Sequence, residues 1–298
     1  MKLGIPKAFV LYKHPGLWES FFNKLGVEVI SSGLTDKEIM REGVKITESE
    51  SCLPVKIFYG HCKKLISQNV DAIFTPHYIS LREKRLGCPK FFAIGDLIPA
   101  IFDNAPEVIS PLIDVQRKNI LNTMIVLGKR FVNKKSVLVY AAKKSIEQYK
   151  CSIGKKREEL IEKLRSSRPK IVLMSHPYNL YDSYVNSDIA KILKGLGVES
   201  IMIDAIRVTK PYPQEYFFHW DFGIEMLNQV DEVLKKNIDG GIQLSTFNCG
   251  CDSVLKEFIE KKFRMADIPY MSLIIDEHTA EAGMLTRLEA FVDTLTIF

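Results

Sequence analysis

Residues Lys170–Asp204 read KIVLMSHPYNLYDSYVNSDIAKILKGLGVESIMID, and the fold can be worked out from this stretch. It begins with an apolar run typical of a buried strand, passes through an amphipathic helix, and ends with a glycine turn and a second apolar run. A helix between two strands supplies the crossover that parallel pairing needs. The stretch therefore predicts one β-α-β unit of a parallel sheet.

The same order occurs near the N-terminus. Segment Lys24–Ser32, KLGVEVISS, matches Gly195–Ile203, GLGVESIMI, and each follows an amphipathic helix. Further apolar runs predict more strands in both halves, whereas the region between the halves has helical periodicity. We therefore expect an α/β fold with two Rossmann-like domains that contain parallel sheets, at residues 1–112 and 169–298, joined by a mostly helical connector at 113–168.

Length and composition are those of a folded protein with two domains. The chain has 298 residues, of which 46% are hydrophobic and 26% charged. The formal net charge of +5 is spread along the chain, so it gives little support to nucleic-acid binding. No run approaches the roughly 18 apolar residues of a membrane span, and the N-terminus does not resemble a signal peptide. We expect a cytoplasmic protein that binds neither nucleic acid nor a membrane.

The cysteines are the best candidates for a functional site, because the sequence contains no phosphate loop, GxGxxG turn, HExxH helix or GxSxG elbow. Cys52, Cys88, Cys249 and Cys251 lie at predicted turns from strand to helix. A helix N-terminus favours thiolate, and thiolates ligate iron–sulfur clusters. Since ligands bind beyond the carboxyl ends of parallel strands, we expect a cluster there that joins both halves.

Buried structural thiols are the alternative interpretation, because the spacing of these cysteines matches no compact metal motif. Cys62 fits the apolar face of its helix, yet it follows Cys52 by ten residues and is kept as an additional candidate ligand. His278 and Glu281 precede the last helix, where they are candidates for proton transfer or simply for helix capping. His61 is a candidate hydrogen-bond donor to the cluster site or a structural histidine.

Five segments together resemble the 2-hydroxyacyl-CoA dehydratase superfamily, in its branch of acyl-CoA dehydratase activase-related proteins. The resemblance runs nearly from end to end and is most specific in CLPVK and DEHTAEAGMLTRLEAF. The matching segments are GIPKAFVLYKHPGLWESFFNKLGVEV (Gly4–Val29), ESCLPVKIFYGHC (Glu50–Cys62), CPKF (Cys88–Phe91), STFNCG (Ser245–Gly250) and DEHTAEAGMLTRLEAFVDTL (Asp276–Leu295).

The resemblance implies a [4Fe-4S] cluster held by Cys52, Cys88 and Cys249, with one iron left open. Two residues depart from the family pattern, since Cys251 stands where proline is usual and Cys62 where an apolar residue is usual. If Cys251 closes the fourth iron, the cluster becomes an electron carrier rather than a substrate site. Additional thiolates also suit an [8Fe-9S] double-cubane cluster, which occurs in a related branch.

The resemblance further implies that a separate ATP-hydrolysing activator or reductase delivers low-potential electrons to this chain. The expected function is reductive or radical chemistry on a small substrate such as an acyl-CoA, as a dehydratase-like lyase or a component of an ATP-dependent reductase. The alternatives are a non-catalytic subunit that carries electrons or a cluster, and a protein that uses the same scaffold with another metal or as a structural partner. A homodimer or heterodimer is also implied.

Overall fold

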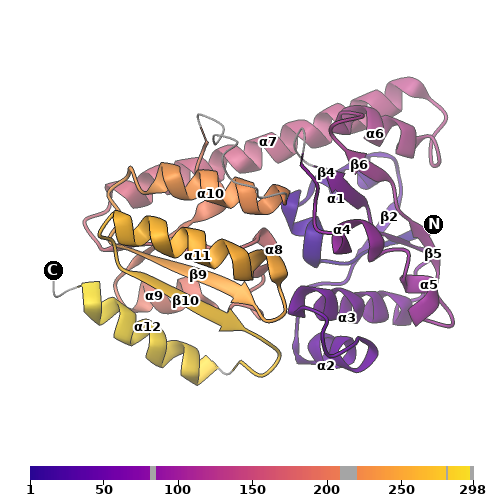
Figure 1. Ribbon diagram of the computed structural model, residues 1–298. Helices are drawn as coiled ribbons and strands as arrows, with labels where there is room; N and C mark the ends of the chain where they lie inside the picture. Colours follow the sequence, from indigo (N-terminus) through magenta and orange to yellow (C-terminus); the bar gives the residue numbers. More distant parts are fainter. Residues whose placement is uncertain (81–84, 209–219, 280, 296–298) are drawn as a thin grey trace. The chain divides into compact units, whose positions relative to one another are not determined.

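The computed structural model describes residues 1–80, 85–208, 220–279 and 281–295 (Figure 1). The chain divides into two compact units, Met1–Ser152 and Ile153–Phe298. Each unit contains a four-stranded sheet in which all pairs are parallel. The prediction of an α/β fold with two Rossmann-like domains is therefore confirmed, while the residue ranges 1–112, 113–168 and 169–298 proposed from the sequence stay predictions.

In the first unit, the sheet has the order β2-β1-β3-β5. The chain forms β1 first, adds β2 on one side, and then crosses over to form β3 on the other side. Because both faces of the central strands are covered, the residues of β3 are all buried. The strands are β1 (Lys2–Ile5), β2 (Glu28–Ser31), β3 (Ala72–Phe74) and β5 (Glu107–Ile109), and a separate parallel pair comprises β4 (His77–Ser80) and β6 (Leu112–Asp114).

Aromatic side chains form much of the core of this unit. The rings of Trp18 and Phe22 each lie 4.9 Å from the ring of Phe74, centroid to centroid, so one helix packs on the middle of the sheet. The helices are α1 (Leu17–Lys24), α2 (Lys37–Ile46), α3 (Leu53–Ser67), α4 (Lys90–Ala93), α5 (Ile98–Ile101) and α6 (Ile120–Gly128), with a 3-10 helix at Phe9–Lys13.

Helices α2 and α3 cross with their backbones in contact (Figure 1). A Cβ atom added to Gly60 would lie 2.0 Å from the carbonyl oxygen of Ile39, and one added to Gly43 would lie 2.0 Å from that of Lys56. Only glycine allows helices to approach this closely. This crossing fixes α3, the helix that begins immediately after Cys52.

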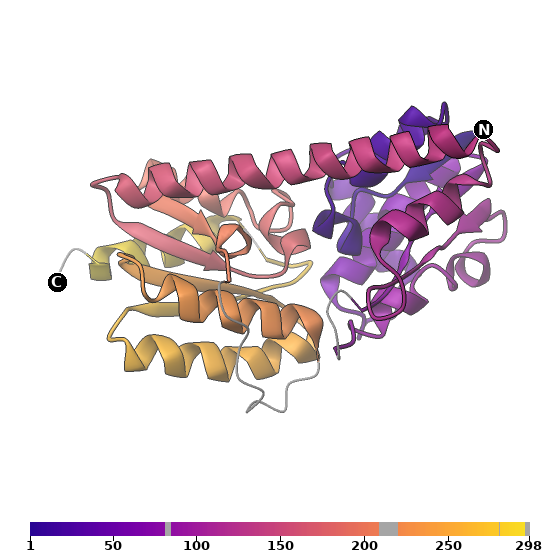
Figure 2. The ribbon, with the colours of Figure 1, turned by 90° about the horizontal axis from the view of Figure 1, so that it is seen from above.

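Helix α7 (Lys135–Arg165) has 31 residues, and the boundary between the two units falls within it. Figure 2 shows the helix as continuous. Segment Ser136–Ala142, SVLVYAA, has the apolar, β-branched composition of a strand, but it is helical, in agreement with the predicted helical connector. Burial of the apolar face, with Leu138 only 1% exposed, overrides the β-propensity of its valines.

In the second unit, the sheet has the order β10-β9-β7-β8. Every residue of β7 and β9 is buried, as expected for central strands with helices on both faces. The strands are β7 (Lys170–Met174), β8 (Glu199–Met202), β9 (Gly240–Thr246) and β10 (Tyr270–Ile275). The helices are α8 (Pro177–Leu180), α9 (Ile189–Gly195), α10 (Asp221–Val233), α11 (Gly250–Met265) and α12 (Glu281–Leu295), with a 3-10 helix at Ile203–Ala205.

The repeated Gly-Val-Glu motif has the same structure in both units. Gly26 and Gly197 have φ angles of 77° and 81°, in the left-handed region that favours glycine. The next residue closes a Schellman motif in each case, with Val27 donating to the Phe22 carbonyl at 3.1 Å and Val198 donating to that of Leu193 at 2.9 Å. The repeat therefore encodes the turn from a helix into the strand beside the first strand of each sheet.

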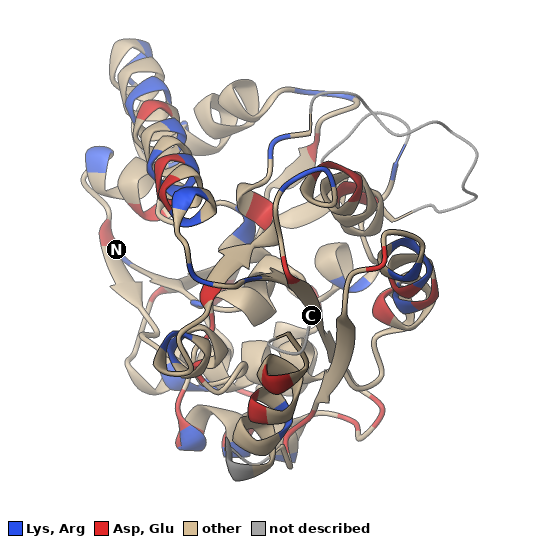
Figure 3. Cartoon of the chain, turned by 90° about the vertical axis from the view of Figure 1, so that its left-hand side faces the viewer, with Lys and Arg blue, Asp and Glu red and all other residues tan. Residues whose placement is uncertain are grey.

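Charged side chains of both signs are interspersed on the helices (Figure 3). This distribution agrees with the small formal net charge of +5. Within the described ranges, no helix combines the length and the apolar character that crossing a bilayer requires.

Candidate functional site

Two of the cysteines predicted as ligands stand at helix starts, and a third lies just before a short helix. Cys52 is the N-cap residue of α3, and Cys249 is the N-cap residue of α11, which follows β9. Cys88 lies two residues before α4. The dipole of a helix places partial positive charge at its N-terminus, where a thiolate is favoured. Cys249 therefore has the predicted turn from strand to helix. Cys52 instead follows helix α2, and Cys251 lies inside the first turn of α11, so the prediction of a strand before the turn was wrong for Cys52.

Two of these thiols lie close together in the first unit. The ammonium of Lys90 donates to the Cys52 sulfur at 3.5 Å. Burial raises the pKa of the Cys88 thiol, a hydrogen bond from the Lys90 backbone lowers it, and a negative charge on Cys52 raises it further. Two thiolates at this place repel each other, and coordination to iron would relieve that repulsion. Their proximity and donor type fit an iron–sulfur cluster.

A pocket of about 260 Å³ lies beside Lys90 in the same unit. Val55, Tyr59 and Ile94 form part of its apolar wall, and Glu48 adds an acidic group. The Tyr59 hydroxyl donates to the Ile94 carbonyl at 3.0 Å, so its polar end is satisfied and its ring forms a wall. The pocket thus combines apolar surface with a positive charge that also contacts a candidate ligand.

Cys249 belongs to the second unit, where it is the N-cap residue of α11. Asn248 has a φ of 62°, and the Ser253 hydroxyl donates to the Cys249 carbonyl at 2.9 Å in the first turn of α11. Cys251, in the same turn, lies with His176 and Asp252, and one donor atom from each of the three residues lies within 4.8 Å of the others.

The sequence analysis missed His176 and Asp252. The sequence did contain one signal for His176. His176-Pro177 follows the apolar run of β7 just as Cys249-Gly250 follows that of β9, so the two pairs stand at equivalent strand-to-helix turns. Both turns therefore lie at the carboxyl edge of the sheet.

The other two cysteines have different surroundings. The Cys62 side chain is fully buried, and burial raises the pKa of its thiol well above the ordinary value. Ten helical residues separate it from Cys52, a distance of about 15 Å along α3. This position gives no support to Cys62 as a ligand. Cys151 is exposed on α7.

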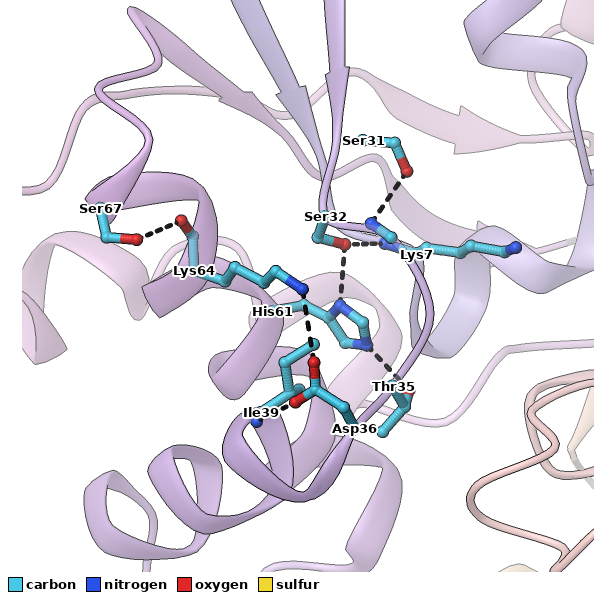
Figure 4. A network of polar contacts seen from close by, with 10 residues as sticks. Lys7, Ser31, Ser32, Thr35, Asp36, Ile39, His61, Lys64 and Ser67 are labelled. Atoms are coloured by element: carbon cyan, nitrogen blue, oxygen red, sulfur yellow. Dashed lines mark hydrogen bonds and ion pairs between the residues drawn. The ribbon is translucent and has the colours of Figure 1, made fainter.

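His61 is a structural residue (Figure 4). Its Nδ1 lies 2.8 Å from the Ser32 hydroxyl and its Nε2 lies 2.9 Å from the Thr35 hydroxyl, so both ring nitrogens have partners. The ring is fully buried, and burial lowers its pKa to about 4. His61 is therefore neutral at pH 7 and ties the loop after β2 to α3.

The low pKa of His61 predicts loss of stability in acid. Between the ordinary pKa of 6.5 and the folded value of about 4, the unfolded chain binds a proton here that the folded chain does not. We expect this group to remove up to about 3 kcal/mol of the free energy of unfolding as the pH falls through that window. Urea unfolding of His61→Gln at pH 7 and pH 4.5 should show a smaller acid loss than the native chain. An equal loss in both proteins, with His278→Gln as an exposed control, would refute the assignment.

His278 lies in an exposed turn after β10. Its backbone N–H donates to the Asp276 carboxylate at 2.9 Å, and the Thr279 hydroxyl donates to the same oxygen at 3.0 Å. The Glu281 side chain lies outside the described residues. The Asp276 carboxylate thus stabilises this turn without any catalytic role. A catalytic role for His278 and Glu281 stays a prediction.

Parallel α/β units with cysteines at helix starts define the chain as a Rossmann-like protein with a candidate metal centre. The chain belongs to the family described as the CoA enzyme activase uncharacterised domain (DUF2229), whose model matches residues 2–206. The search of curated proteins found no match.

Solved structures show only distant similarity. The SBP FpvC of Pseudomonas aeruginosa in complex with Ni²⁺ is 11% identical, with 99% of this chain and 97% of that chain covered and a TM-score of 0.27. A Zn(II)-bound AdcAII variant of Streptococcus pneumoniae has the same identity, coverage and TM-score.

Proposed function

We propose that this chain is an iron–sulfur protein of the 2-hydroxyacyl-CoA dehydratase system, which accepts low-potential electrons from a separate ATP-hydrolysing activator and acts on a small acyl substrate. Cys52, Cys88 and Cys249 hold a [4Fe-4S] cluster in this proposal, and an [8Fe-9S] double cubane is the alternative cofactor. Membership of the activase-domain family supports a role of this chain in the dehydratase system. The observation that carries the proposal is the group of Cys52, Cys88 and Lys90 beside an apolar pocket.

The donor set supports an iron–sulfur cluster rather than a hard cation. Sulfur ligands select iron–sulfur clusters and soft metals, whereas Mg²⁺ and Ca²⁺ take oxygen ligands. The start of α3 and the ammonium of Lys90 both place positive charge near the Cys52 sulfur. These charges favour an electron-rich centre. The bound cluster supplies one-electron reduction, and the protein supplies its ligands and surroundings.

The pocket supports a small acyl group as substrate. A volume of about 260 Å³ is below the roughly 300 to 1,000 Å³ of pockets that hold a drug-sized ligand, so only the reacting part of a thioester fits inside. Val55 and Ile94 present apolar surface to that part. Lys90 offers a charged hydrogen bond to its carbonyl oxygen, which stabilises negative charge on that atom.

Replacing Lys90 by methionine should weaken the binding of a short-chain acyl-CoA. Loss of one charge-assisted hydrogen bond costs roughly 1.5 to 3 kcal/mol, or about a tenfold to hundredfold increase in Kd. Calorimetric titration of anaerobically purified Lys90→Met measures this change. Lys129→Met, at an exposed lysine that ends α6, is the matched control. Equal Kd values for the native chain and both variants would remove the pocket from the proposal.

Electron acceptance is tested by mixing the cluster-loaded chain with an ATP-hydrolysing activator and recording EPR spectra with and without ATP. The proposal predicts ATP-dependent reduction of the cluster and a change in the spectrum when acyl-CoA is added. Failure to accept electrons, together with failure to bind any acyl-CoA, would refute the function.

A further inference from the structure

A second cluster of metal-binding side chains lies within the second unit. His176 follows β7 by two residues, while Cys251 and Asp252 lie in the first turn of α11, which follows β9. Strands β7 and β9 are neighbours, and the chain places β8 on one side of β7 before it crosses to β9 on the other side. Ligand sites of parallel α/β sheets lie at this reversal, beyond the carboxyl ends of the strands.

The buried polar atoms of this cluster have no hydrogen-bond partners among the described residues. The side chains of His176 and Asp252 are only 3% and 1% exposed, yet both imidazole nitrogens and both carboxylate oxygens lack a hydrogen bond. His176 Nε2 and Asp252 Oδ1 approach to 2.9 Å without the alignment of a hydrogen bond. Leaving a carboxylate buried in this way is strongly unfavourable.

A shared metal ion explains this arrangement better than an ion pair does. Ligand atoms about 2.0 to 2.2 Å from one tetrahedral ion lie roughly 3.3 to 3.6 Å apart and point at the ion, not at each other. The 2.9 Å approach is shorter than that spacing, but the lack of hydrogen-bond alignment is what two atoms that point at a shared ion would show. A thiolate and a carboxylate also carry two negative charges, which a divalent ion neutralises.

Aromatic rings hold the imidazole in place. The His176 ring stacks on Tyr178 with centroids 5.1 Å apart and planes 21° apart. It also meets the Phe222 ring, from α10, at 5.5 Å and 79°. These contacts fix the orientation of the imidazole and form a dry wall beside it.

We propose that His176, Cys251 and Asp252 bind one divalent transition-metal ion of the zinc type, with a set of ligands that includes none of Cys52, Cys88 and Cys249. Mixed nitrogen, sulfur and oxygen ligands suit zinc and exclude the hard cations Mg²⁺ and Ca²⁺. Three protein ligands leave a fourth tetrahedral position open for water or a substrate oxygen.

Cobalt(II) is the probe for this site, because a cobalt–thiolate bond gives a charge-transfer band in the near ultraviolet. We expect the metal-free full-length chain to bind Co²⁺ with this band, and Cys251→Ser to lose it. Cys249→Ser and the exposed control Cys151→Ser should keep it. Absence of the band in the native chain, its survival in Cys251→Ser, or its loss in Cys249→Ser would overturn the proposal.

Asp252→Asn provides a second test that preserves side-chain shape. Removal of one ligand charge should weaken Co²⁺ binding at least about 100-fold, more than the loss of a supporting residue typically costs. Zn²⁺ should raise the Tm of the native chain but not that of this variant, and an equal rise in both would contradict the site.

The iron and sulfide content of Cys251→Ser distinguishes failure of this metal site from failure of the proposed iron–sulfur function. Cys251→Ser should keep both, and their loss would make Cys251 a cluster ligand instead.

Discussion

Gly60→Ala is expected to destabilise the Met1–Ser152 unit by about 3 kcal/mol or more, because the added methyl group forces two helix backbones apart. The Cβ would lie 2.0 Å from the carbonyl oxygen of Ile39, and a backbone atom cannot rotate away as a side chain can. Alanine is favoured over glycine in a helix by about 1 kcal/mol, so helix propensity acts in the opposite direction. A loss of stability can therefore come only from the contact between α2 and α3.

Urea unfolding followed by circular dichroism measures this effect, and Gly154→Ala is the matched control. Gly154 lies in α7 and no atom lies within 4 Å of an added Cβ, so alanine should leave stability unchanged or raise it by up to about 1 kcal/mol. Gly43→Ala should behave like Gly60→Ala, since its Cβ meets the Lys56 carbonyl. Equal urea midpoints of unfolding for Gly60→Ala and Gly154→Ala would rule out the close crossing of α2 and α3.

Cys52→Ser should lose most of the bound iron. A serine hydroxyl is a poor ligand for iron–sulfur clusters, and the exchange also removes the sulfur that Lys90 contacts. Cys88→Ser should have the same effect, since its thiol lies near that of Cys52. Iron and sulfide analysis of anaerobically purified variants is the measurement.

Two other cysteines provide controls for that experiment. Cys62 is fully buried along α3, and Cys151 is exposed on α7. Serine at either position should leave the iron content unchanged, although Cys62→Ser will lower stability because it buries a hydroxyl. Iron that survives in Cys52→Ser but is lost in Cys62→Ser would contradict the proposed ligands.

The sequence predicts the fold well because its signals are local. Gly26 and Gly197 mark equivalent helix ends, and the apolar runs of β7 and β9 are long enough to indicate buried strands. SVLVYAA was ambiguous because a short apolar run fits a strand or a buried helix face. Its place in α7 depends on the rest of that helix.

The candidate sites could be predicted only in part, because they depend on contacts between distant segments. Cys52 and Cys249 were recognisable as helix starts, and the structure places both at N-caps. The group of His176 with Asp252 forms only when β7 pairs with β9, which no local pattern reveals. The contact between Gly60 and Ile39 likewise depends on the angle at which two helices cross.

The most direct test of the account is the iron and acid-labile sulfide content of the anaerobically purified and reconstituted chain, with EPR spectra of the reduced form. We expect about four irons and about four sulfides per chain, with the signal of a reduced cubane. About eight irons would select the double cubane. Absence of iron and sulfide after reconstitution would refute a cluster in this chain and leave Cys52, Cys88 and Cys249 as structural thiols.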